Sequence, residues 1–344
     1  MRRYAVLTEG KLDSIYAKTA HGVLRYRPGE VAVVVDSAFA GRTVREVLPS
    51  VDSSAPVVGS LREALPYAPN ALLVGVATDG GHLPNAMRPA VLDAVAAGLD
   101  VVSGLHERLQ DDVEIAAAAA QSGSVLFDVR VPPREVPLFQ GRSRRPDQRV
   151  VLAVGSDCAV GKMTVMLEIE RFALAAGARV AFAATGQTGI MIAGSGIAVD
   201  GVVSDFLTGA AEMLVDEALE RGDVALVEGQ GSVLHPAYAP VTVGLLYGCA
   251  PDALVLCHRP GSTTIAGFAT SIPPLRELVR VHEDFLAYVK PARVLAIALD
   301  TSALDPNAAD RAIFAAEAET GLPADDPVRN GGEKLWRAIE TRRG

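Results

Sequence analysis

Short, continuous runs of apolar residues alternate along the chain with longer segments in which apolar residues recur every three or four positions. The short runs predict strands buried on both faces, and the longer segments predict helices with one buried face. In the first half the expected strands are residues 30–37, 71–78, 99–105 and 125–130, and the expected helices are residues 43–50, 86–98 and 106–123. Buried strands separated by helices are typical of a parallel sheet covered on both faces. The first half is therefore predicted to be an α/β domain.

The second half repeats this pattern without repeating the sequence. Its expected strands are residues 149–156, 178–186, 223–231, 252–258 and 292–300, and its clearest expected helices are residues 162–177, 209–222 and 273–289. Between the halves, residues 131–149 carry four prolines and five arginines, and such a segment cannot continue a helix or a central strand. We therefore expect two α/β domains, residues 1–135 and 149–344, joined by a linker at 136–148. A length of 344 residues suits two domains.

Charge and cysteine content narrow the classes of function. The formal net charge of −9 argues against a nucleic-acid-binding surface, which needs clustered Lys and Arg, and the basic cluster at 141–149 is interpreted as part of a solvated linker. Cys158, Cys249 and Cys257 form neither a zinc-binding spacing nor a closed set of disulfides, which favours a reducing compartment. The N-terminus has no secretory h-region, and no run approaches about 18 apolar residues. We expect a cytoplasmic protein that binds neither nucleic acid nor membrane.

One segment has the pattern of a phosphate-binding loop. It follows the strand expected at 149–156, contains two glycines and closes on a lysine at the start of a helix. Glycines let backbone N–H groups turn inward around an anion, the helix N-terminus carries partial positive charge, and Lys162 adds a full one. The residues expected to bind the cofactor are Gly155, Ser156, Asp157, Cys158, Ala159, Val160, Gly161, Lys162, Met163 and Thr164. The alternative is an ordinary glycine turn with a surface lysine, but the apolar strand and the Gly-Lys pair at the helix start favour the anion-binding loop.

The loop departs from the usual P-loop in a way that affects the metal. Five residues separate Gly155 from Gly161, one more than usual, and Met163 stands where Ser or Thr normally binds magnesium. Thr164 follows about 100° further round the helix, so it does not simply replace a hydroxyl at position 163. Either the loop is remodelled so that Thr164 reaches a metal, or no protein hydroxyl binds the metal directly. Anion binding is therefore better supported than Mg²⁺ binding.

Three more glycine-rich, polar segments follow predicted strands, at 186–200, 228–238 and 258–268. Ligands of open parallel sheets bind beyond the carboxyl ends of the strands, so these segments and the P-loop predict one site. The candidate catalytic residues are Glu228, His235 and Lys162, because a strand-end carboxylate or an imidazole can act as a general base and a lysine supplies positive charge. The candidate substrate-binding residues are Gln187, Thr188, Gln230 and His258, and the imidazole of His258 is a further candidate general base.

These residues also have plainer interpretations. Glu228 could cap a helix or face solvent, and either histidine could be structural. Cys158 lies at a helix start, where thiols become more reactive, but a small residue packed under the loop is the simpler explanation. Asp157 could contact substrate or metal. The first half lacks a G-x-G-x-x-G after its first predicted strand, which argues against NAD binding there.

The chain resembles a bacterial family of two-domain P-loop proteins, formerly a domain of unknown function and now described as D-glutamate N-acetyltransferases of D-amino-acid catabolism. The segments that carry the resemblance are "GSDCAVGKMT" (155–164), "VEGQGS" (227–232), "CHRPG" (257–261), "VSGLHERLQDD" (102–112) and "TGLPADDPVRNGG" (320–332). The loop is also similar to that of the dethiobiotin synthetase group, in which Thr directly follows Lys. The family resemblance implies a Rossmann-like N-terminal domain, a P-loop NTPase-like C-terminal domain and acetyl-CoA as the acetyl donor.

The expected function is transfer of an acetyl group from acetyl-CoA to the amino group of an amino acid such as D-glutamate. The P-loop could hold the phosphates of CoA without a magnesium-binding hydroxyl, Glu228 or His235 could be the base, and loop amides could hold the thioester oxyanion. One alternative is an ATP-dependent kinase or ligase, with Mg²⁺ held by Thr164 and Glu228. Another is a nucleotide-binding regulator. The expected partner is a small-molecule amino acid, and the expected assembly is a homo-oligomer.

Overall fold

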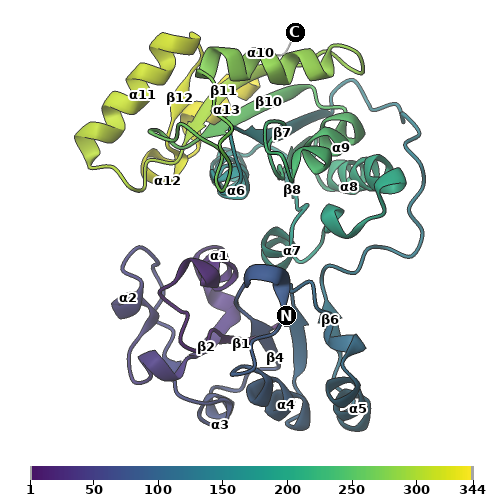
Figure 1. The fold of residues 1–344 in the computed structure, drawn as a ribbon, viewed down its shortest axis with the longest axis vertical. Helices are drawn as coiled ribbons and strands as arrows, with labels where there is room; N and C mark the ends of the chain where they lie inside the picture. Colours follow the sequence, from purple (N-terminus) through teal and green to yellow (C-terminus); the bar gives the residue numbers. More distant parts are fainter. Residues whose placement is uncertain (1, 342–344) are drawn as a thin grey trace. The chain divides into compact units, whose positions relative to one another are not determined.

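The computed structural model describes residues 2–341 of the chain, which form two compact units. Unit 1 contains Met1–Val131 and Gln187–Gly194, and unit 2 contains Pro132–Gly186 and Ser195–Gly344. Each unit has its own parallel six-stranded sheet, and no strand lies between residues 131 and 149 (Figure 1). The predicted fold class, two parallel-sheet α/β domains, is confirmed.

The sheet of unit 1 has the order β3-β2-β1-β4-β5-β6. Its strands are β1 (Tyr4–Leu7), β2 (Val31–Val35), β3 (Val57–Val58), β4 (Ala71–Val74), β5 (Asp100–Ser103) and β6 (Leu126–Asp128), and all neighbours pair in parallel. This order, with the first strand near the centre, is that of a doubly wound Rossmann-like sheet. Its helices are α1 (Lys18–Tyr26), α2 (Val44–Val47), α3 (Leu61–Ala64), α4 (Arg88–Ala96), α5 (Val113–Ser122) and α7 (Gln187–Ala193).

Helix α7 comes from the middle of the second half of the sequence but packs in unit 1, against α1 (Figure 1). The sequence predicts only a glycine-rich loop at 186–200. Met191 and Ile192 are buried, and Arg27 donates through Nε to the carbonyl oxygen of Ile192 (2.5 Å). Packing against α1 stabilises a helix that contains Gly189, although glycine disfavours helix interiors.

The sheet of unit 2 has the order β12-β11-β10-β7-β9-β8, again with parallel neighbours. Its strands are β7 (Arg149–Gly155), β8 (Val180–Ala183), β9 (Val224–Val227), β10 (Ala253–His258), β11 (Arg293–Leu299) and β12 (Ala324–Asp325). Its helices are α6 (Lys162–Ala175), α8 (Leu207–Arg221), α9 (Ala239–Cys249), α10 (Leu275–Leu286), α11 (Pro306–Thr320), α12 (Pro327–Asn330) and α13 (Glu333–Thr341). The first strand of this sheet, β7, lies between β10 and β9. The loop after β7 therefore lies at the topological switch point, from which successive strands are added on opposite sides of β7.

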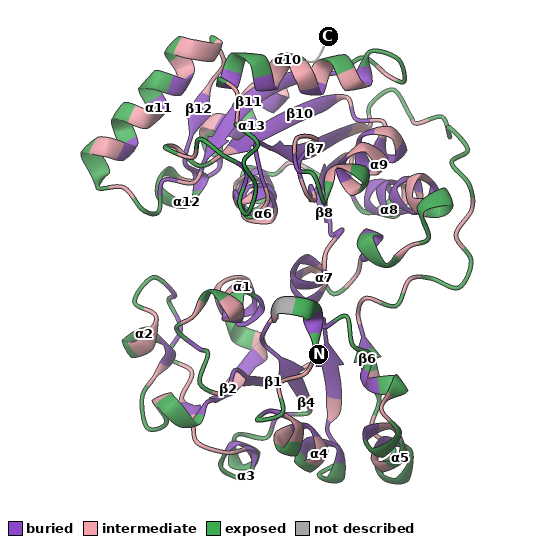
Figure 2. Ribbon diagram, viewed as in Figure 1, coloured by how far each residue is buried: buried purple, intermediate pink, exposed green. Residues whose placement is uncertain are grey.

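Helices cover both faces of the sheet in unit 2. Helices α8, α9, α10 and α11 form a contiguous row on one face, while α6 packs with α12 and α13 on the other (Figure 1). The strands are almost entirely buried, and the helices are exposed on their outer sides (Figure 2). This explains the continuous apolar runs of the strands and the three- to four-residue periodicity of the helices.

Several boundaries differ from the expected ones, and two of the differences have a clear cause. The helix expected at 106–123 begins only at Val113, because Asp112 caps it by accepting from the amides of Glu114 (3.1 Å) and Ile115 (3.0 Å). The segment expected as a linker, 136–148, belongs to unit 2, where buried Glu212 accepts from the amides of Gln140 (2.8 Å) and Arg142 (2.7 Å). None of the helices in residues 2–341 is long and apolar enough to cross a membrane.

Candidate functional site

The site of unit 2 forms where β7, β8, β9 and β10 end together at one edge of the sheet. The loop after β7 leads directly into α6, so a strand, a glycine loop and a helix follow one another as the sequence predicts. Ala159 (φ 53°) and Gly161 (φ 89°) adopt left-handed conformations on either side of Val160, and Gly161 is the residue before α6. This local path is the kind of backbone that turns N–H groups toward an anion.

Asp157 fixes the shape of the loop. Its Oδ1 accepts from the amide of Cys158 (2.6 Å), and its Oδ2 accepts from the amide of Ala266 (2.8 Å), which lies in the segment after β10. Arg259 donates to the carbonyl oxygen of Ala159 (2.8 Å) and is held by Asp300 (2.7 Å). The loop is therefore tied on both sides to the segment that follows β10.

Lys162 is buried, with 6% of its surface exposed, which excludes the interpretation as a surface lysine. Its Nζ donates to the carbonyl oxygen of Asp157 (2.7 Å), and an ammonium group has three N–H donors, so it retains capacity for an anionic ligand. Burial lowers the pKa of Lys162, and the neighbouring Cys257, Cys158, Asp157 and Glu228 oppose that shift. A bound phosphate would compensate the buried charge in the same way.

Glu228 follows β9 and is also buried, with 5% of its surface exposed, so it neither faces solvent nor caps a helix. Its Oε2 accepts from the amides of Thr185 (2.9 Å) and Gly186 (3.0 Å), which follow β8. Burial raises the pKa of Glu228 to about 7, against the opposing effects of these amides and of Lys162. A carboxyl group with this pKa can accept and release a proton at neutral pH, as a general base must.

Gly229 brings Glu228 close to the P-loop. A Cβ atom on Gly229 would lie 1.8 Å from the carbonyl oxygen of Ala153 in β7 and 3.0 Å from Cδ of Lys162. Gly229 is therefore required by the close approach of two backbones. Beyond it, Gln230 donates to Oγ1 of Thr185 (3.1 Å), so its amide group is part of the β8–β9 contact.

His258, at the end of β10, holds the first residue of the loop. Its Nδ1 lies 2.9 Å from Oγ of Ser156, and the carbonyl oxygen of Ser156 accepts from Oγ of Ser232 (3.1 Å). Burial lowers the pKa of His258, which favours its neutral form. The ring thus positions the loop. Ser232 was not singled out from the sequence, although it lies in the quoted segment 227–232.

His235 has a fixed orientation. It is 3% exposed, and its ring packs between Tyr238 (ring centroids 4.6 Å apart) and Phe268 (5.1 Å). Its Nδ1 accepts from the amide of Ala237 (3.2 Å), so in the neutral ring the proton is on Nε2. A neutral His235 in this tautomer is a hydrogen-bond donor through Nε2, and its role as a base stays a prediction.

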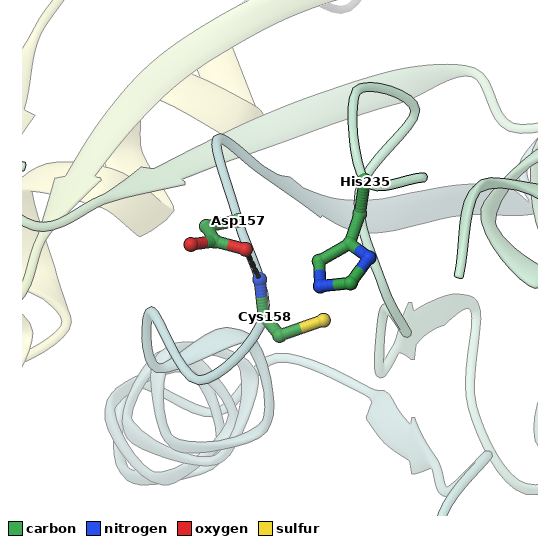
Figure 3. Close-up of side chains that lie close together, drawn as sticks. All are labelled: Asp157, Cys158 and His235. Atoms are coloured by element: carbon green, nitrogen blue, oxygen red, sulfur yellow. Dashed lines mark hydrogen bonds between the residues drawn. The ribbon is translucent and has the colours of Figure 1, made fainter. Parts of the chain in front are cut away.

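Asp157, Cys158 and His235 place one side-chain atom each within 4.8 Å of one another (Figure 3). In the part of the chain that the structure describes, this is the one group of three such side chains with potential metal-ligating atoms so close together. A metal would need the lone pair of Nε2, which carries the proton when Nδ1 accepts from Ala237. The donor set therefore does not fit a metal ion.

The remaining predicted residues lie in two places. Met163 and Thr164 are half-buried in the first turn of α6. Gln187 and Thr188 belong to unit 1, where Gln187 Oε1 accepts from Nε of Arg130 (2.9 Å) and Thr188 Oγ1 lies 3.1 Å from Oγ1 of Thr19. These two side chains hold α7 within unit 1. Thr185, two residues before Gln187, belongs to the site of unit 2, where its amide donates to Glu228.

Comparison with known proteins agrees with this architecture. A family model described as the DUF1611 domain of unknown function, a P-loop domain, matches residues 137–336, and its N-terminal companion, described as a Rossmann-like domain, matches residues 37–132. A protein of Tritonibacter scottomollicae named D-glutamate N-acetyltransferase is 36% identical over 334 residues, covering 95% of each chain. A protein of a Pseudoalteromonas species with the same name is 34% identical over 278 residues, covering 80% of this chain and 83% of its own.

A solved structure extends the similarity to the fold of the whole chain. The crystal structure of a DUF1611 family protein from Anabaena variabilis has a TM-score of 0.93 and 37% sequence identity, and the match covers 99% of this chain and 100% of the other. The two family models and the solved structure agree with the two-domain fold described above. The chain belongs to the DUF1611 family of two-domain proteins, with a Rossmann-like N-terminal domain and a P-loop C-terminal domain.

Proposed function

We propose that this protein is an N-acetyltransferase that moves an acetyl group from acetyl-CoA to the amino group of an amino acid such as D-glutamate. The names of the two relatives support this reaction class. The observation that carries the proposal is the pair of buried groups beside the loop, Lys162 and Glu228. One is a cation suited to phosphate, and the other is a carboxyl group with a pKa of about 7.

The loop fits the phosphates of a CoA thioester. Residues 155–161 supply a turn with two left-handed residues, α6 presents its N-terminus, and Lys162 supplies a buried charge. None of these interactions needs a protein hydroxyl on magnesium, which accounts for Met163 in place of Ser or Thr. Acetyl-CoA would supply the activated acetyl group.

Glu228 is suited to the proton that the acceptor must lose. An amino acid at neutral pH carries an ammonium group, whose nitrogen has no lone pair until it releases a proton. The pKa of about 7 lets Glu228 take that proton near neutral pH, and backbone amides of Thr185 and Gly186 hold its carboxylate in place. Formation of the amide C–N bond then breaks the bond between the acetyl carbon and sulfur.

The sequence of the loop and the contacts of Glu228 favour this reaction over an ATP-dependent one. Met163 stands where a P-loop enzyme normally has a magnesium-binding hydroxyl, and Oε2 of Glu228 already accepts two amide hydrogen bonds.

The test is to incubate the protein with acetyl-CoA and D-glutamate, with L-glutamate as the matched acceptor, in Mg²⁺ and separately in EDTA. We expect acetyl-CoA consumption and N-acetyl amino acid formation to survive EDTA, and we expect Thr164→Ala to reduce the rate only slightly. Release of ADP from ATP with Mg²⁺ and an amino acid, without acetyl-CoA consumption, would refute the transferase and support the ATP enzyme. Tight ATP binding without turnover of either donor would support a regulator.

A further inference from the structure

We propose that Arg259 forms a second anion site beside the P-loop, and that this site binds the 3′-phosphate on the ribose of CoA. CoA carries this phosphate in addition to the pyrophosphate that we assign to residues 155–161 and Lys162. The inference rests on the proposed function and deepens it, because it assigns the group that recognises the adenosine half of the donor and selects CoA over ligands without a 3′-phosphate.

The guanidinium group of Arg259 is fixed against the P-loop. Its Nε and Nη2 donate to Oδ2 of Asp300 (3.0 and 2.7 Å), and Nη2 also donates to the carbonyl oxygen of Ala159 (2.8 Å). Burial opposes ionisation of Asp300, but hydrogen bonds from Ser302 and Arg259 outweigh burial and lower the pKa of Asp300. Arg259 is therefore held in place before a ligand binds, which reduces the entropy lost on binding.

Arg259 retains donors that the chain does not use. A guanidinium group has five N–H donors, and the three hydrogen bonds to Asp300 and Ala159 leave both N–H groups of Nη1 without an acceptor in residues 2–341. The side chain is 46% exposed, so a ligand can reach it. Such donors suit a phosphate, to which arginine makes short, charge-assisted hydrogen bonds.

The charges on the two sides of the P-loop decide where the 3′-phosphate fits. The strand order β11-β10-β7-β9 places Arg259, after β10, and Glu228, after β9, on opposite sides of β7 and its loop. On the side of β9 a phosphate would meet a carboxyl group whose ionised form repels it, and on the side of β10 it meets a guanidinium group. Only the ribose separates the 3′-phosphate from the pyrophosphate, and Arg259 contacts Ala159 of the loop directly, so one CoA molecule can reach both sites.

The P-loop alone does not distinguish CoA from ATP. Both ligands carry a pyrophosphate on the 5′ oxygen of adenosine, so loop amides and Lys162 would bind the same group in either one. ATP, ADP and dephospho-CoA all lack the 3′-phosphate. A site for this phosphate therefore supplies a selectivity that the loop does not have.

The first experiment compares CoA with dephospho-CoA, which differ in this phosphate alone, by calorimetric titration of the full chain. We expect the wild-type protein to bind CoA about 10- to 100-fold more tightly, which is the size of effect that a hydrogen bond between charged groups produces. Higher ionic strength should narrow the difference, because salt screens a partly exposed guanidinium group. Equal affinity for the two ligands would overturn the proposal without the need for a variant.

Variants then assign the preference to Arg259. Arg259→Gln should bind the two ligands with nearly equal affinity, and Arg259→Lys, which keeps the charge, should retain part of the preference for CoA. The matched control is Arg179→Gln, because Arg179 also pairs with an aspartate, Asp223 (3.1 Å), but lies before β8 at the opposite edge of the sheet. This control should keep the full preference.

The simpler interpretation of Arg259 is a brace between the P-loop and the segment after β10. A brace would act on every ligand of the loop alike, so folded Arg259→Gln would lose the same factor of affinity for CoA and for dephospho-CoA. An unchanged ratio of the two affinities in this variant, with folding verified by thermal unfolding, would refute the phosphate site.

Steady-state kinetics provide an independent readout. With D-glutamate as the acceptor, Arg259→Gln should raise the KM for acetyl-CoA by about 10- to 100-fold and lower kcat much less. The reason is that the 3′-phosphate takes no part in the chemistry and contributes equally to binding of the ground state and of the transition state. A loss confined to kcat would contradict the assignment.

The outcomes separate this inference from the proposed function. If the wild-type protein prefers CoA to dephospho-CoA through Arg259 but transfers no acetyl group, the phosphate site stands and the proposed reaction is wrong. If it acetylates D-glutamate but binds CoA and dephospho-CoA equally, the reaction stands and the phosphate site is wrong. If it binds ATP with Mg²⁺ and neither CoA nor dephospho-CoA, both proposals fail.

Discussion

At the residue scale, the site depends on an uncommon combination, a lysine and a glutamate that are both buried beside the same loop. Burial of either group alone would be costly, and each is compensated by backbone dipoles and by the other. Lys162 donates to a carbonyl oxygen, and Glu228 accepts from two amides. Groups held in this way are candidates for function, because perturbed pKa values concentrate at active sites.

Replacing Lys162 by alanine should abolish ligand binding while the protein stays folded. Loss of a buried charge that contacts phosphate costs about 2–5 kcal/mol of binding free energy. Calorimetric titration with acetyl-CoA measures the effect, and Lys18→Ala, an exposed lysine in unit 1, is the matched control. Unchanged affinity of the Lys162 variant for both CoA and ATP would contradict the P-loop assignment.

Replacing Glu228 by glutamine should lower kcat by about 10²–10⁴-fold with a smaller change in KM, since the variant lacks the base but keeps the shape and amide contacts. In the wild-type protein, kcat should rise as pH increases through about 7, because only the ionised form of Glu228 accepts a proton. The exposed Glu217→Gln on α8 is the control. Near-normal turnover of the Glu228 variant would give Glu228 a structural role.

Glu228 should also make stability depend on pH. Its pKa is raised from 4.5 to about 7 in the folded state, so the folded protein holds this proton more tightly than the unfolded chain. The resulting contribution to the free energy of unfolding is fully present below the unfolded pKa and is lost as pH rises through about 7. Urea unfolding between pH 5 and 8 should therefore show a smaller decrease in stability for Glu228→Gln than for wild type. An equal decrease in both proteins would show that Glu228 does not titrate there.

The sequence identified the loop residues but not their partners. Glycine spacing and the Gly161-Lys162 pair predict an anion-binding loop, and the structure places it between a strand and a helix. The tautomer of His235 follows from the amide of Ala237, and the role of His258 follows from Ser156. The His258–Ser156 contact joins residues far apart in the sequence, and spacing along the chain does not reveal it.

At the element scale, close backbone packing between β7 and the segment after β9 builds the site. Gly229→Ala should destabilise the protein by about 3 kcal/mol or more, because its Cβ would meet the carbonyl oxygen of Ala153 at 1.8 Å and the backbones must separate. Thermal unfolding measures the loss. Gly29→Ala, where a Cβ meets nothing within 4 Å, should leave stability nearly unchanged. Equal stability of the two variants would contradict this packing.

Most strands were recognisable from their composition, and the exceptions have physical reasons. β2, β4, β7 and β10 are apolar runs buried on both faces, which is the strongest signal that a parallel strand gives. β1 has only four residues, Tyr4–Leu7, and was not identified, although it occupies a central position in the sheet of unit 1. Its importance comes from pairing with β2 and β4, which local composition does not encode.

At the scale of the whole molecule, the sequence predicts two α/β domains but not that a piece of the second half folds with the first. The strand orders follow from two series of apolar runs on either side of a proline-rich segment. Helix α7 leaves unit 2 after Gly186 and returns at Ser195. Residues that fold with a distant part of the chain leave no local signal apart from the glycines at 186 and 194, which flank the helix.

The packing of α7 in unit 1 leads to a prediction about the stability of unit 1 in isolation. A fragment of residues 1–131 lacks α7, so the surface of α1 that contacts it becomes exposed, and the burial of Met191 and Ile192 is lost. Burying each such side chain contributes about 1.5–3 kcal/mol, so the loss of about 3–6 kcal/mol is a large part of the stability of a small domain. We expect this fragment to unfold at lower urea concentration than the same fragment joined through a flexible linker to residues 186–195.

The comparison has an internal control in the polar contacts of α7. In the joined fragment, Arg27→Ala removes the hydrogen bond from Nε to Ile192 (2.5 Å) and should cost about 1 kcal/mol, a fraction of the effect of removing the helix. Exposed Arg62→Ala, on α3, should cost much less. If residues 1–131 unfold at the same urea concentration with and without the attached segment, α7 is not an integral part of unit 1.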